Sequence, residues 1–338
     1  MKAVMIREHG SAEEALKVET NVPIPTLQPG QVLIRNEYSG LNFIDTYFRT
    51  GLYKQELPFI SGQEGGGIVH SIHPDDQDAS PFQVGDRVVY MTFGSLAEYT
   101  AVPTAKVVKL PDGISMEIAV ACMVQGLTAH YLVTDATAGL ISRDEWCLIY
   151  SVGSGTCQWA AQMTKLQGYK VIGTTSKGKQ ETCPSDCCDE LIVLDEVDGK
   201  SYSDYTSVDI QKRVMDITSS TGVKLIVDGV GKSTADISIG CLARRGIWIS
   251  FGNASGAVPP VSLLKFTPKS AFCTRPKLGD YVATRDELEQ RCNDVFGWVK
   301  SNQLKVKVDQ IFSIDEASKG HLYLESGNSK GKILFKIS

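Results

Sequence analysis

A run of small residues directly after an apolar segment is the first candidate for chemistry. The apolar residues 146–150 lead into Ser151-Val152-Gly153-Ser154-Gly155-Thr156-Cys157, and apolar residues then recur at helical spacing from Trp159 to Leu166. Strand, tight turn and helix form the context in which backbone N–H groups and a helix N-terminus hold a pyrophosphate. The segment predicts a dinucleotide-binding loop, although a plain strand–helix turn could look the same. Cys157 stands where the usual third glycine would be.

The end of the next apolar run predicts which dinucleotide binds. An NAD-binding protein places Asp or Glu about 20 residues beyond the loop, on the ribose 2′-hydroxyl. Here the run ends in Gly173-Thr174-Thr175-Ser176-Lys177-Gly178-Lys179, with hydroxyls and two cations but no acid. A carboxylate would repel a 2′-phosphate, whereas Ser176 and Lys177 complement one. The segment therefore favours NADPH over NADH, with a solvated surface loop as the alternative.

The elements around these motifs alternate in a way that defines a fold class. The first 110 residues are β-rich and broken by Pro and Gly, which predicts a small barrel-like domain. Residues 114–135 have helical apolar spacing. Short apolar runs then alternate with helical or polar stretches, which is typical of a doubly wound parallel sheet. The expected strands of that sheet are 146–150, 170–174, 190–194, 224–228 and 246–251.

Composition narrows the function classes. The 338 residues are 42% hydrophobic, enough for two cored domains, and the net charge of −5 argues against binding a phosphate backbone. No apolar run approaches the roughly 20 residues of a membrane span, so a cytoplasmic protein is expected. Of nine cysteines only Cys183, Cys187 and Cys188 cluster, without C-x2-C spacing or nearby histidines. No metal site is expected.

Several segments together resemble one family. The chain is similar to the quinone oxidoreductases related to zeta-crystallin, in the medium-chain dehydrogenase/reductase superfamily, over almost its whole length. The segments that carry the resemblance are 40–47 (GLNFIDTY) with Arg49, 51–53 (GLY), 58–60 (PFI) with Gly62, 64–65 (EG), 97–99 (AEY), 109–113 (KLPDG), 126–129 (GLTA), 250–256 (SFGNASG) and 274–276 (TRP).

The resemblance implies an α/β fold in which a Rossmann doubly wound parallel sheet accompanies a GroES-like β-barrel catalytic domain. Residues 1–124 and 268–338 would form the catalytic domain, and residues 125–267 the Rossmann NADPH-binding domain. It also implies a homodimer joined through the Rossmann sheets. The implied activity is hydride transfer from NADPH to a quinone, a small-molecule substrate, without zinc or flavin.

The resemblance also implies roles for single residues. Zinc-dependent relatives use a Cys and a His where this chain has Asn42 and Gln63, neither a good zinc ligand. Asn42, Tyr47 and Tyr53 would lie beside the nicotinamide and substrate as the catalytic set. The remaining cofactor contacts would be Thr128, Ser154, Gly155 and Thr156 near the cofactor and its pyrophosphate, Ser176 and Lys177 at the 2′-phosphate, Phe251 and Gly252 beside the nicotinamide, and Asn328 and Lys332 from the C-terminal segment.

Two departures from the family pattern bear on cofactor affinity rather than on fold. The family loop is usually Ala-Ala-Ala-Gly-Gly-Val-Gly, of which residues 151–157 keep one glycine in place. Cys183-Pro184-Ser185 interrupts a stretch that is a regular helix in relatives, because proline disfavours helix at the residue before it.

Two other functions stay open. Related branches of the superfamily reduce α,β-unsaturated carbonyls with NADPH, by similar hydride chemistry. A zeta-crystallin-like protein could instead act by binding, as a structural crystallin or on AU-rich RNA, although the acidic charge makes nucleic acid a poorer fit.

Overall fold

The computed structural model describes residues 1–153, 155–184, 186–196, 198 and 203–338. The predicted contact residue Ser154, and Ser185 of the expected helix interruption, lie outside the described residues. The chain divides into two compact units. The first comprises Met1–Leu127, Val282–Asn302 and Val306–Ser338, and the second comprises Thr128–Tyr281 and Gln303–Lys305.

The first unit is built around one long strand, β3 (Gln31–Leu41). β3 pairs antiparallel with β5 (Glu64–Ile72), β7 (Tyr99–Pro103) and β16 (Lys332–Lys336). Beyond β5 the sheet continues to β6 (Arg87–Met91) and β8 (Val107–Lys109), and beyond β16 to β15 (Val308–Ser313). A smaller sheet has the order β2 (Leu16–Glu19), β1 (Ala3–Ile6) and β4 (Phe59–Ile60).

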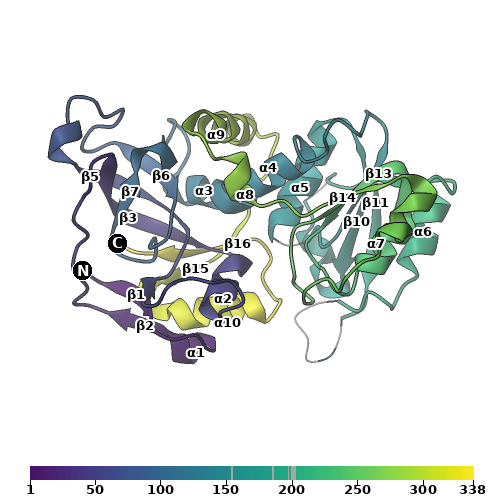
Figure 1. Ribbon diagram of the computed structural model, residues 1–338, viewed down its shortest axis with the longest axis horizontal. Helices are drawn as coiled ribbons and strands as arrows, with labels where there is room; N and C mark the ends of the chain where they lie inside the picture. Colours follow the sequence, from purple (N-terminus) through teal and green to yellow (C-terminus); the bar gives the residue numbers. More distant parts are fainter. Residues whose placement is uncertain (154, 185, 197, 199–202) are drawn as a thin grey trace. The chain divides into compact units, whose positions relative to one another are not determined.

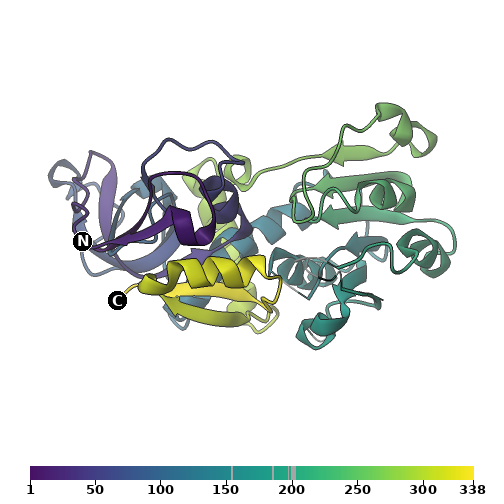
Figure 2. The same ribbon diagram turned by 90° about the horizontal axis from the view of Figure 1, so that it is seen from below.

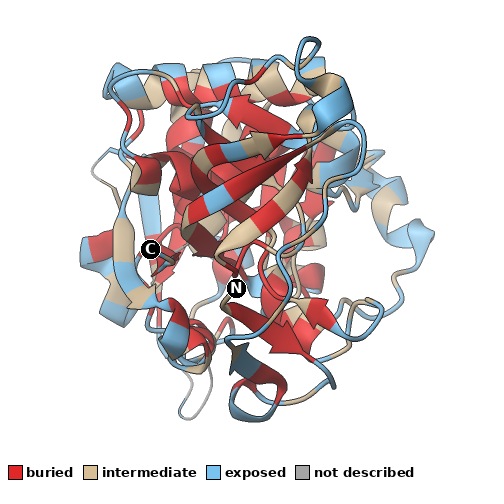
Figure 3. Ribbon diagram, turned by 90° about the vertical axis from the view of Figure 1, so that its left-hand side faces the viewer, coloured by how far each residue is buried: buried red, intermediate tan, exposed pale blue. Residues whose placement is uncertain are grey.

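Burial explains why these segments are strands. Val32 and Ile34 of β3, two residues apart, are both inaccessible and share one apolar cluster with Val69 and Val88. Residues at this spacing point to the same side of a strand. Figure 3 shows the buried residues gathered in the strands of this unit, with exposed residues on helices and loops.

Helices complete the first unit (Figures 1 and 2). α10 (Ala317–Glu325) packs on β15 and β16, where Gly320 leaves room for the Phe335 ring. The other helical elements are α1 (Ala12–Ala15), α2 (Phe43–Arg49), η1 (Pro74–Asp76), η2 (Thr104–Lys106), α3 (Met116–Ala121), η3 (Cys122–Gly126), α9 (Arg285–Lys300) and η6 (Ile314–Glu316).

The second unit contains the expected doubly wound sheet. Over the described residues its strand order is β11 (Glu190–Leu194), β10 (Lys170–Ser176), β9 (Trp146–Ile149), β12 (Val223–Asp228), β13 (Leu242–Ser250) and β14 (Phe272–Thr274), and every pairing is parallel. In chain order this is 3-2-1-4-5-6, the order of dinucleotide-binding sheets, with the reversal between β9 and β12. The predicted Rossmann arrangement is confirmed.

The helices of the second unit connect these strands. They are α4 (Leu127–Val133), which begins at the last residue of the first unit, α5 (Gly155–Leu166), η4 (Lys177–Thr182), α6 (Ile210–Ile217), α7 (Ala235–Cys241), η5 (Leu263–Lys269) and α8 (Leu278–Tyr281). The sequence placed the domain boundary at residues 267/268, but β14 extends the parallel sheet and belongs with it. Three residues give too short a pattern to reveal a strand from sequence.

The helical spacing at 114–135 corresponds to one continuous run through α3, η3 and α4, in which η3 is a π-helical turn. Among the described residues, Met116–Val133 is the one helical run long and apolar enough to cross a membrane. It is 78% buried within the structure, as the core helix of a folded domain would be.

Candidate active site

Three strand ends meet at one edge of the first unit's sheet. Asn42 directly follows β3, while Glu64 and Lys332 are the first residues of β5 and β16. Because β3 runs antiparallel to both neighbours, its end and their starts lie at the same edge. The fold therefore brings three polar side chains together from distant parts of the sequence.

These three side chains form a closed polar cluster. The Asn42 amide donates to Glu64 Oε1 at 2.6 Å, and Lys332 Nζ donates to Asn42 Oδ1 at 2.8 Å. Lys332 also contacts the Glu64 carboxylate and donates to the Leu41 carbonyl at 3.1 Å. Neither the Glu64 nor the Lys332 side chain is exposed. A buried ion pair with this many hydrogen bonds satisfies the charges that burial removes from water.

The sequence makes room for the Glu64 carboxylate. A Cβ atom added to Gly40 would lie 2.1 Å from Glu64 Oε1, so a side chain at position 40 would displace it. The other carboxylate oxygen accepts the backbone N–H of Val124, in the π-helical turn η3. Glu64 thus ties β5 to both β16 and η3. Glu64 is fully buried at the start of β5.

A second carboxylate, Asp45, lies beside this cluster at the start of α2. Asp45 accepts the Asn42 backbone N–H at 2.7 Å and the Gln63 side-chain amide at 3.1 Å. Burial raises the pKa of Asp45 to about 7, against the opposing effect of these two donors, and the Glu64 charge raises it further. The site therefore holds a carboxyl group that titrates near neutral pH, a property found at functional sites.

Asn42 and Gln63, the residues expected at the positions of zinc ligands in zinc-dependent relatives, both donate hydrogen bonds to carboxylates. Asn42 donates to Glu64 and Gln63 donates to Asp45. Within the ranges that the structure describes, no three His, Cys, Asp or Glu side chains form a group that could hold a metal ion. The side chains of this site are amides, carboxylates and an ammonium group that hydrogen-bond to one another.

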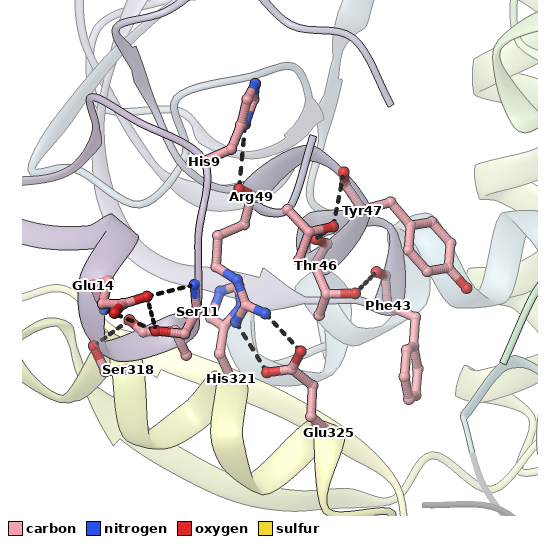
Figure 4. Close-up of polar contacts among 12 residues, drawn as sticks. His9, Ser11, Glu14, Phe43, Thr46, Tyr47, Arg49, Ser318, His321 and Glu325 are labelled. Atoms are coloured by element: carbon pink, nitrogen blue, oxygen red, sulfur yellow. Dashed lines mark hydrogen bonds and ion pairs between the residues drawn. The ribbon is translucent and has the colours of Figure 1, made fainter. Parts of the chain in front are cut away.

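Tyr47 and Tyr53, the predicted catalytic tyrosines, lie next to each other. Their rings meet edge to face with centroids 5.2 Å apart, and the Tyr53 N–H donates to the Tyr47 carbonyl at 3.1 Å. Both residues are half-buried. The ring of Tyr47 points away from Arg49 on the same helix (Figure 4). The structure thus presents two phenol groups as a pair.

Arg49 anchors the other side of α2. Its guanidinium donates to both Glu325 carboxylate oxygens, at 2.9 and 2.6 Å, and one of its nitrogens lies 3.4 Å from His321 Nδ1 (Figure 4). Bidentate pairs of this kind fix orientation as well as adding stability. Burial, followed by the Arg49 charge, lowers the pKa of His321 to about 3. Arg49 therefore holds α2, with Tyr47, against α10.

In the second unit, the glycine loop follows β9 as expected. Gly153 is required sterically, because an added Cβ would lie 2.6 Å from Thr175 Oγ1 and 3.0 Å from the Lys179 carbonyl. Ser151 adopts a left-handed φ of 59° although it is not glycine. Its N–H donates to Thr174 Oγ1 at 3.1 Å, and its hydroxyl lies 3.0 Å from that of Tyr205. These bonds offset a conformational cost of about 1–2 kcal/mol.

The helix after this loop begins at Gly155, with φ of 50°, and Thr156 follows. Both are partly exposed at the N-terminus of a twelve-residue helix. Cys157 is buried, and burial raises the pKa of its thiol to about 12, so it packs as a small apolar group. A turn without room for a side chain at Gly153, ending at a helix N-terminus, fits a dinucleotide pyrophosphate.

Ser176 ends β10, and Lys177 begins the short helix η4. Lys177 is exposed and Ser176 is partly exposed. η4 ends at Thr182, and Cys183 adopts an extended conformation before Pro184. The predicted helix interruption at this point is confirmed for the described residues. One hydrogen bond ties η4 to the glycine loop, because Thr182 Oγ1 donates to the Gly153 carbonyl at 2.8 Å. Gln158 Nε2, from α5, donates to the same carbonyl at 2.9 Å.

Phe251 and Gly252 follow β13, where the backbone is held closely. An added Cβ on Gly252 would lie 2.3 Å from the Gly229 carbonyl. Arg275 donates to the carbonyls of Ser250 and Gly252, both at 3.0 Å. Asp228, at the end of β12, is fully buried, and its side chain accepts the N–H groups of Val230 and Gly231. These contacts fix both strand ends.

The structure therefore brings together some predicted residues and separates others. Asn42 and Lys332 share one cluster, and Tyr47 and Tyr53 share a ring contact. Asn328 is exposed in the segment before β16 and is not among the cluster's hydrogen-bond partners, as far as the described contacts go. Thr128 is buried in α4 of the second unit.

Four residues make important contacts in these sites, but no role was predicted for them from the sequence. They are Asp45, Glu64, Asp228 and Arg275. For Asp45 a signal existed, because an acid three residues after Asn42 is the spacing of a helix cap. Glu64 pairs with Lys332 over 268 positions, a separation that no local pattern reports. Arg275 was noted only within the family segment 274–276.

The strand order of the second unit and the loop before α5 are those of a dinucleotide-binding fold. Residues 28–112 match the family described as alcohol dehydrogenase GroES-like domain, and residues 195–334 match the family described as zinc-binding dehydrogenase. The expected GroES-like domain is thereby confirmed.

Known proteins place the chain in a family. The quinone oxidoreductase of Pseudomonas aeruginosa is 34% identical over 90% of both chains. A 2-haloacrylate reductase of Burkholderia is 29% identical over 98% of both. The structure of Escherichia coli quinone oxidoreductase complexed with NADPH is 32% identical, covers 100% of both chains and has a TM-score of 0.90. The chain belongs to the quinone oxidoreductase family of the medium-chain dehydrogenase/reductase superfamily.

Proposed function

We propose that this protein transfers hydride from NADPH to quinones, with neither zinc nor flavin. The observation that carries the proposal is full-length similarity, in sequence and fold, to quinone oxidoreductases, one of them complexed with NADPH. The glycine loop after β9 and the Ser176-Lys177 segment at the end of β10 support the proposal. When bound, NADPH supplies the hydride.

The residues of the second unit would hold the cofactor. Gly155 and Thr156, at the N-terminus of α5, would bind the pyrophosphate through backbone N–H groups. Ser176 and Lys177 would bind the 2′-phosphate by a hydroxyl and a cation. Phe251 and Gly252 would lie beside the nicotinamide, where the closely held backbone keeps the surface in place. Thr128 of the second unit, and Asn42, Asn328 and Lys332 of the first unit, complete the proposed set.

The residues of the first unit would serve the substrate. Reduction of a quinone places negative charge on its oxygen, which then needs a proton. Tyr47 and Tyr53 are the proposed donors, since a phenol can donate a hydrogen bond and then a proton. Asn42 would orient the reacting groups, because its amide is already fixed between Glu64 and Lys332.

We also propose a homodimer joined through the parallel sheets. β14 is an edge strand of that sheet among the described strands, and its Phe272 is 43% exposed. Leu263 and Leu264, in the preceding η5, are 83% and 78% exposed. An exposed edge with apolar neighbours can pair with the same edge of a second copy in a two-fold arrangement.

A second candidate is reduction of α,β-unsaturated carbonyls, favoured by the similarity to a 2-haloacrylate reductase. Turnover with benzoquinone, naphthoquinone and an alkenal, measured with the same NADPH, separates the two. Faster turnover of the alkenal than of either quinone would favour the second candidate.

Fluorescence titration with NADPH tests both enzyme functions at once. We expect saturable binding. No binding at millimolar NADPH would refute both and leave a binding function, as a crystallin or on AU-rich RNA, as the alternative.

A further inference from the structure

A carboxylate lies against the segment proposed to hold the 2′-phosphate. β10 and β11 are parallel, and their last paired residues are Ser176 and Leu194. Gly178 lies two residues beyond Ser176, and Glu196 lies two residues beyond Leu194. A Cβ atom added to Gly178 would lie 2.9 Å from Glu196 Oε1. The two segments that follow β10 and β11 therefore stay side by side beyond the sheet. The Glu196 carboxylate lies against the first turn of η4.

The backbone that carries Glu196 is held by contacts on both sides. The Asp195 N–H donates to Ser207 Oγ at 3.1 Å, and the Asp195 carbonyl accepts the Asp204 N–H at 2.7 Å. Glu196 itself forms an isolated antiparallel bridge with Ser203. Glu196 is exposed, so its carboxylate is available to a ligand at this end of the sheet.

The position of this carboxylate has a chemical meaning. In doubly wound sheets the adenosine ribose binds beyond the carboxyl end of the second strand, which here is β10. A carboxylate there accepts a hydrogen bond from a free 2′-hydroxyl and repels a 2′-phosphate. Lys177 has the opposite preference. Residues 173–179, around Ser176, contain no acid. The carboxylate at this end of the sheet is that of Glu196, which follows the neighbouring strand β11.

We propose that Glu196 is a specificity-determining residue that opposes Lys177 at the adenosine 2′ position. Its charge weakens binding of the 2′-phosphate, so the protein discriminates between NADPH and NADH less than Lys177 alone would dictate. Gly178 is part of the arrangement, because a side chain there would displace the carboxylate. This inference rests on the proposed function and concerns the same cofactor site.

The test is the ratio of the NADH and NADPH dissociation constants, from fluorescence titrations of the full-length protein. Glu196→Gln should raise the ratio about tenfold by tightening NADPH, equivalent to about 1.4 kcal/mol. Lys177→Ala should lower the ratio by weakening NADPH. The matched control is Glu190→Gln, which removes the same charge from an exposed residue at the opposite end of β11. Its ratio should equal that of the wild type.

The outcomes separate this inference from the function on which it rests. If the wild type binds NADPH but Glu196→Gln leaves the ratio at the wild-type value, the role of Glu196 is refuted and the proposed function stands. An equal change in Glu190→Gln also refutes it, since the effect would then be one of net charge. If the wild type binds neither dinucleotide, the proposed function fails first. High salt should shrink the effect of Glu196→Gln, because an exposed charge is screened.

Discussion

The ammonium group of Lys332 contacts the carboxylate of Glu64, and both side chains are completely buried. This ion pair joins the first residues of β5 and β16 and holds the Asn42 amide between its two charges. Its partners are fixed by three strands rather than by loops, and sites built on strands are held more rigidly. The pair thereby places Asn42 at the proposed substrate site.

Replacing Lys332 by Met should destabilise the protein strongly. The Glu64 carboxylate would stay buried without its cation, which costs about 3–5 kcal/mol in comparable buried pairs. The free energy of unfolding from urea titrations measures this cost. The double variant Glu64→Gln/Lys332→Met should recover part of the loss, because the uncompensated charge is gone. Losses that simply add in the double variant would show that the two residues are not coupled.

Asp45 should make the free energy of unfolding fall as pH rises from about 4 to about 7. Burial raises its pKa to about 7 in the folded protein, whereas an unfolded Asp titrates near 3.9, at about the model-peptide value. Between these values the folded state binds a proton that the unfolded state lacks. The free energy of unfolding therefore decreases with rising pH, by at most about 1.4 kcal/mol per pH unit.

The variant Asp45→Asn should lack this component when urea unfolding is followed from about pH 4 to about pH 7. The exposed Asp112 supplies the control, since Asp112→Asn should keep the wild-type slope. If Asp45→Asn and the wild type show parallel curves, Asp45 does not hold a proton in this range.

His321 should make the free energy of unfolding fall as pH decreases, which is the opposite of the effect of Asp45. Burial and the Arg49 charge lower its pKa to about 3, whereas an unfolded His titrates near about 6.5. As pH falls from about 6.5 to about 3, His321 becomes protonated in the unfolded state but not in the folded state. The free energy of unfolding therefore decreases. His321→Gln should be less stable overall but should lose less further stability on acidification.

His9 provides the comparison for this measurement. It is exposed and contacts the Arg49 carbonyl through its ring (Figure 4), so His9→Gln should keep the acid-induced loss. Because Asp45 and His321 oppose each other between about pH 4 and pH 6.5, the wild type alone conceals both effects. Identical acid sensitivity in His321→Gln and the wild type would contradict the assignment.

The proposed dimer predicts that Leu264→Glu weakens self-association. A charge at this exposed apolar position would have to be buried against the second copy. Sedimentation equilibrium should show a dimer for the wild type and at least a tenfold higher dissociation constant for the variant. Leu322→Glu, at an exposed leucine of α10, should leave the dimer intact. A monomeric wild type, or an undisturbed Leu264→Glu dimer, would contradict the β14 interface.

The second unit could be predicted from sequence in most of its parts. Its long strands are apolar runs separated by helical stretches, and the loop before α5 and the end of β10 carry local signals. β14 escaped prediction because three residues give no period, and its strand identity depends on pairing with β13. The π-helical turn at η3 escaped because its spacing differs little from that of an α-helix over five residues.

The first unit's site was less accessible to sequence reasoning. Asn42 and Lys332 were expected near the cofactor, but their hydrogen bonds to each other and to Glu64 depend on three strands meeting at one edge. Glu196 illustrates the same limit, because its contact with Gly178 follows from strand register rather than from the motif around Lys177. Sequence patterns report neighbours along the chain, and these contacts are neighbours only in the fold.

The most direct test of the proposed activity is quinone-dependent oxidation of NADPH by the purified protein after treatment with a metal chelator. We expect NADPH consumption that requires both protein and quinone, equals the quinone reduced, and is unaffected by the chelator or by added flavin. Absence of quinone-dependent NADPH oxidation with both benzoquinone and naphthoquinone would contradict the proposed function.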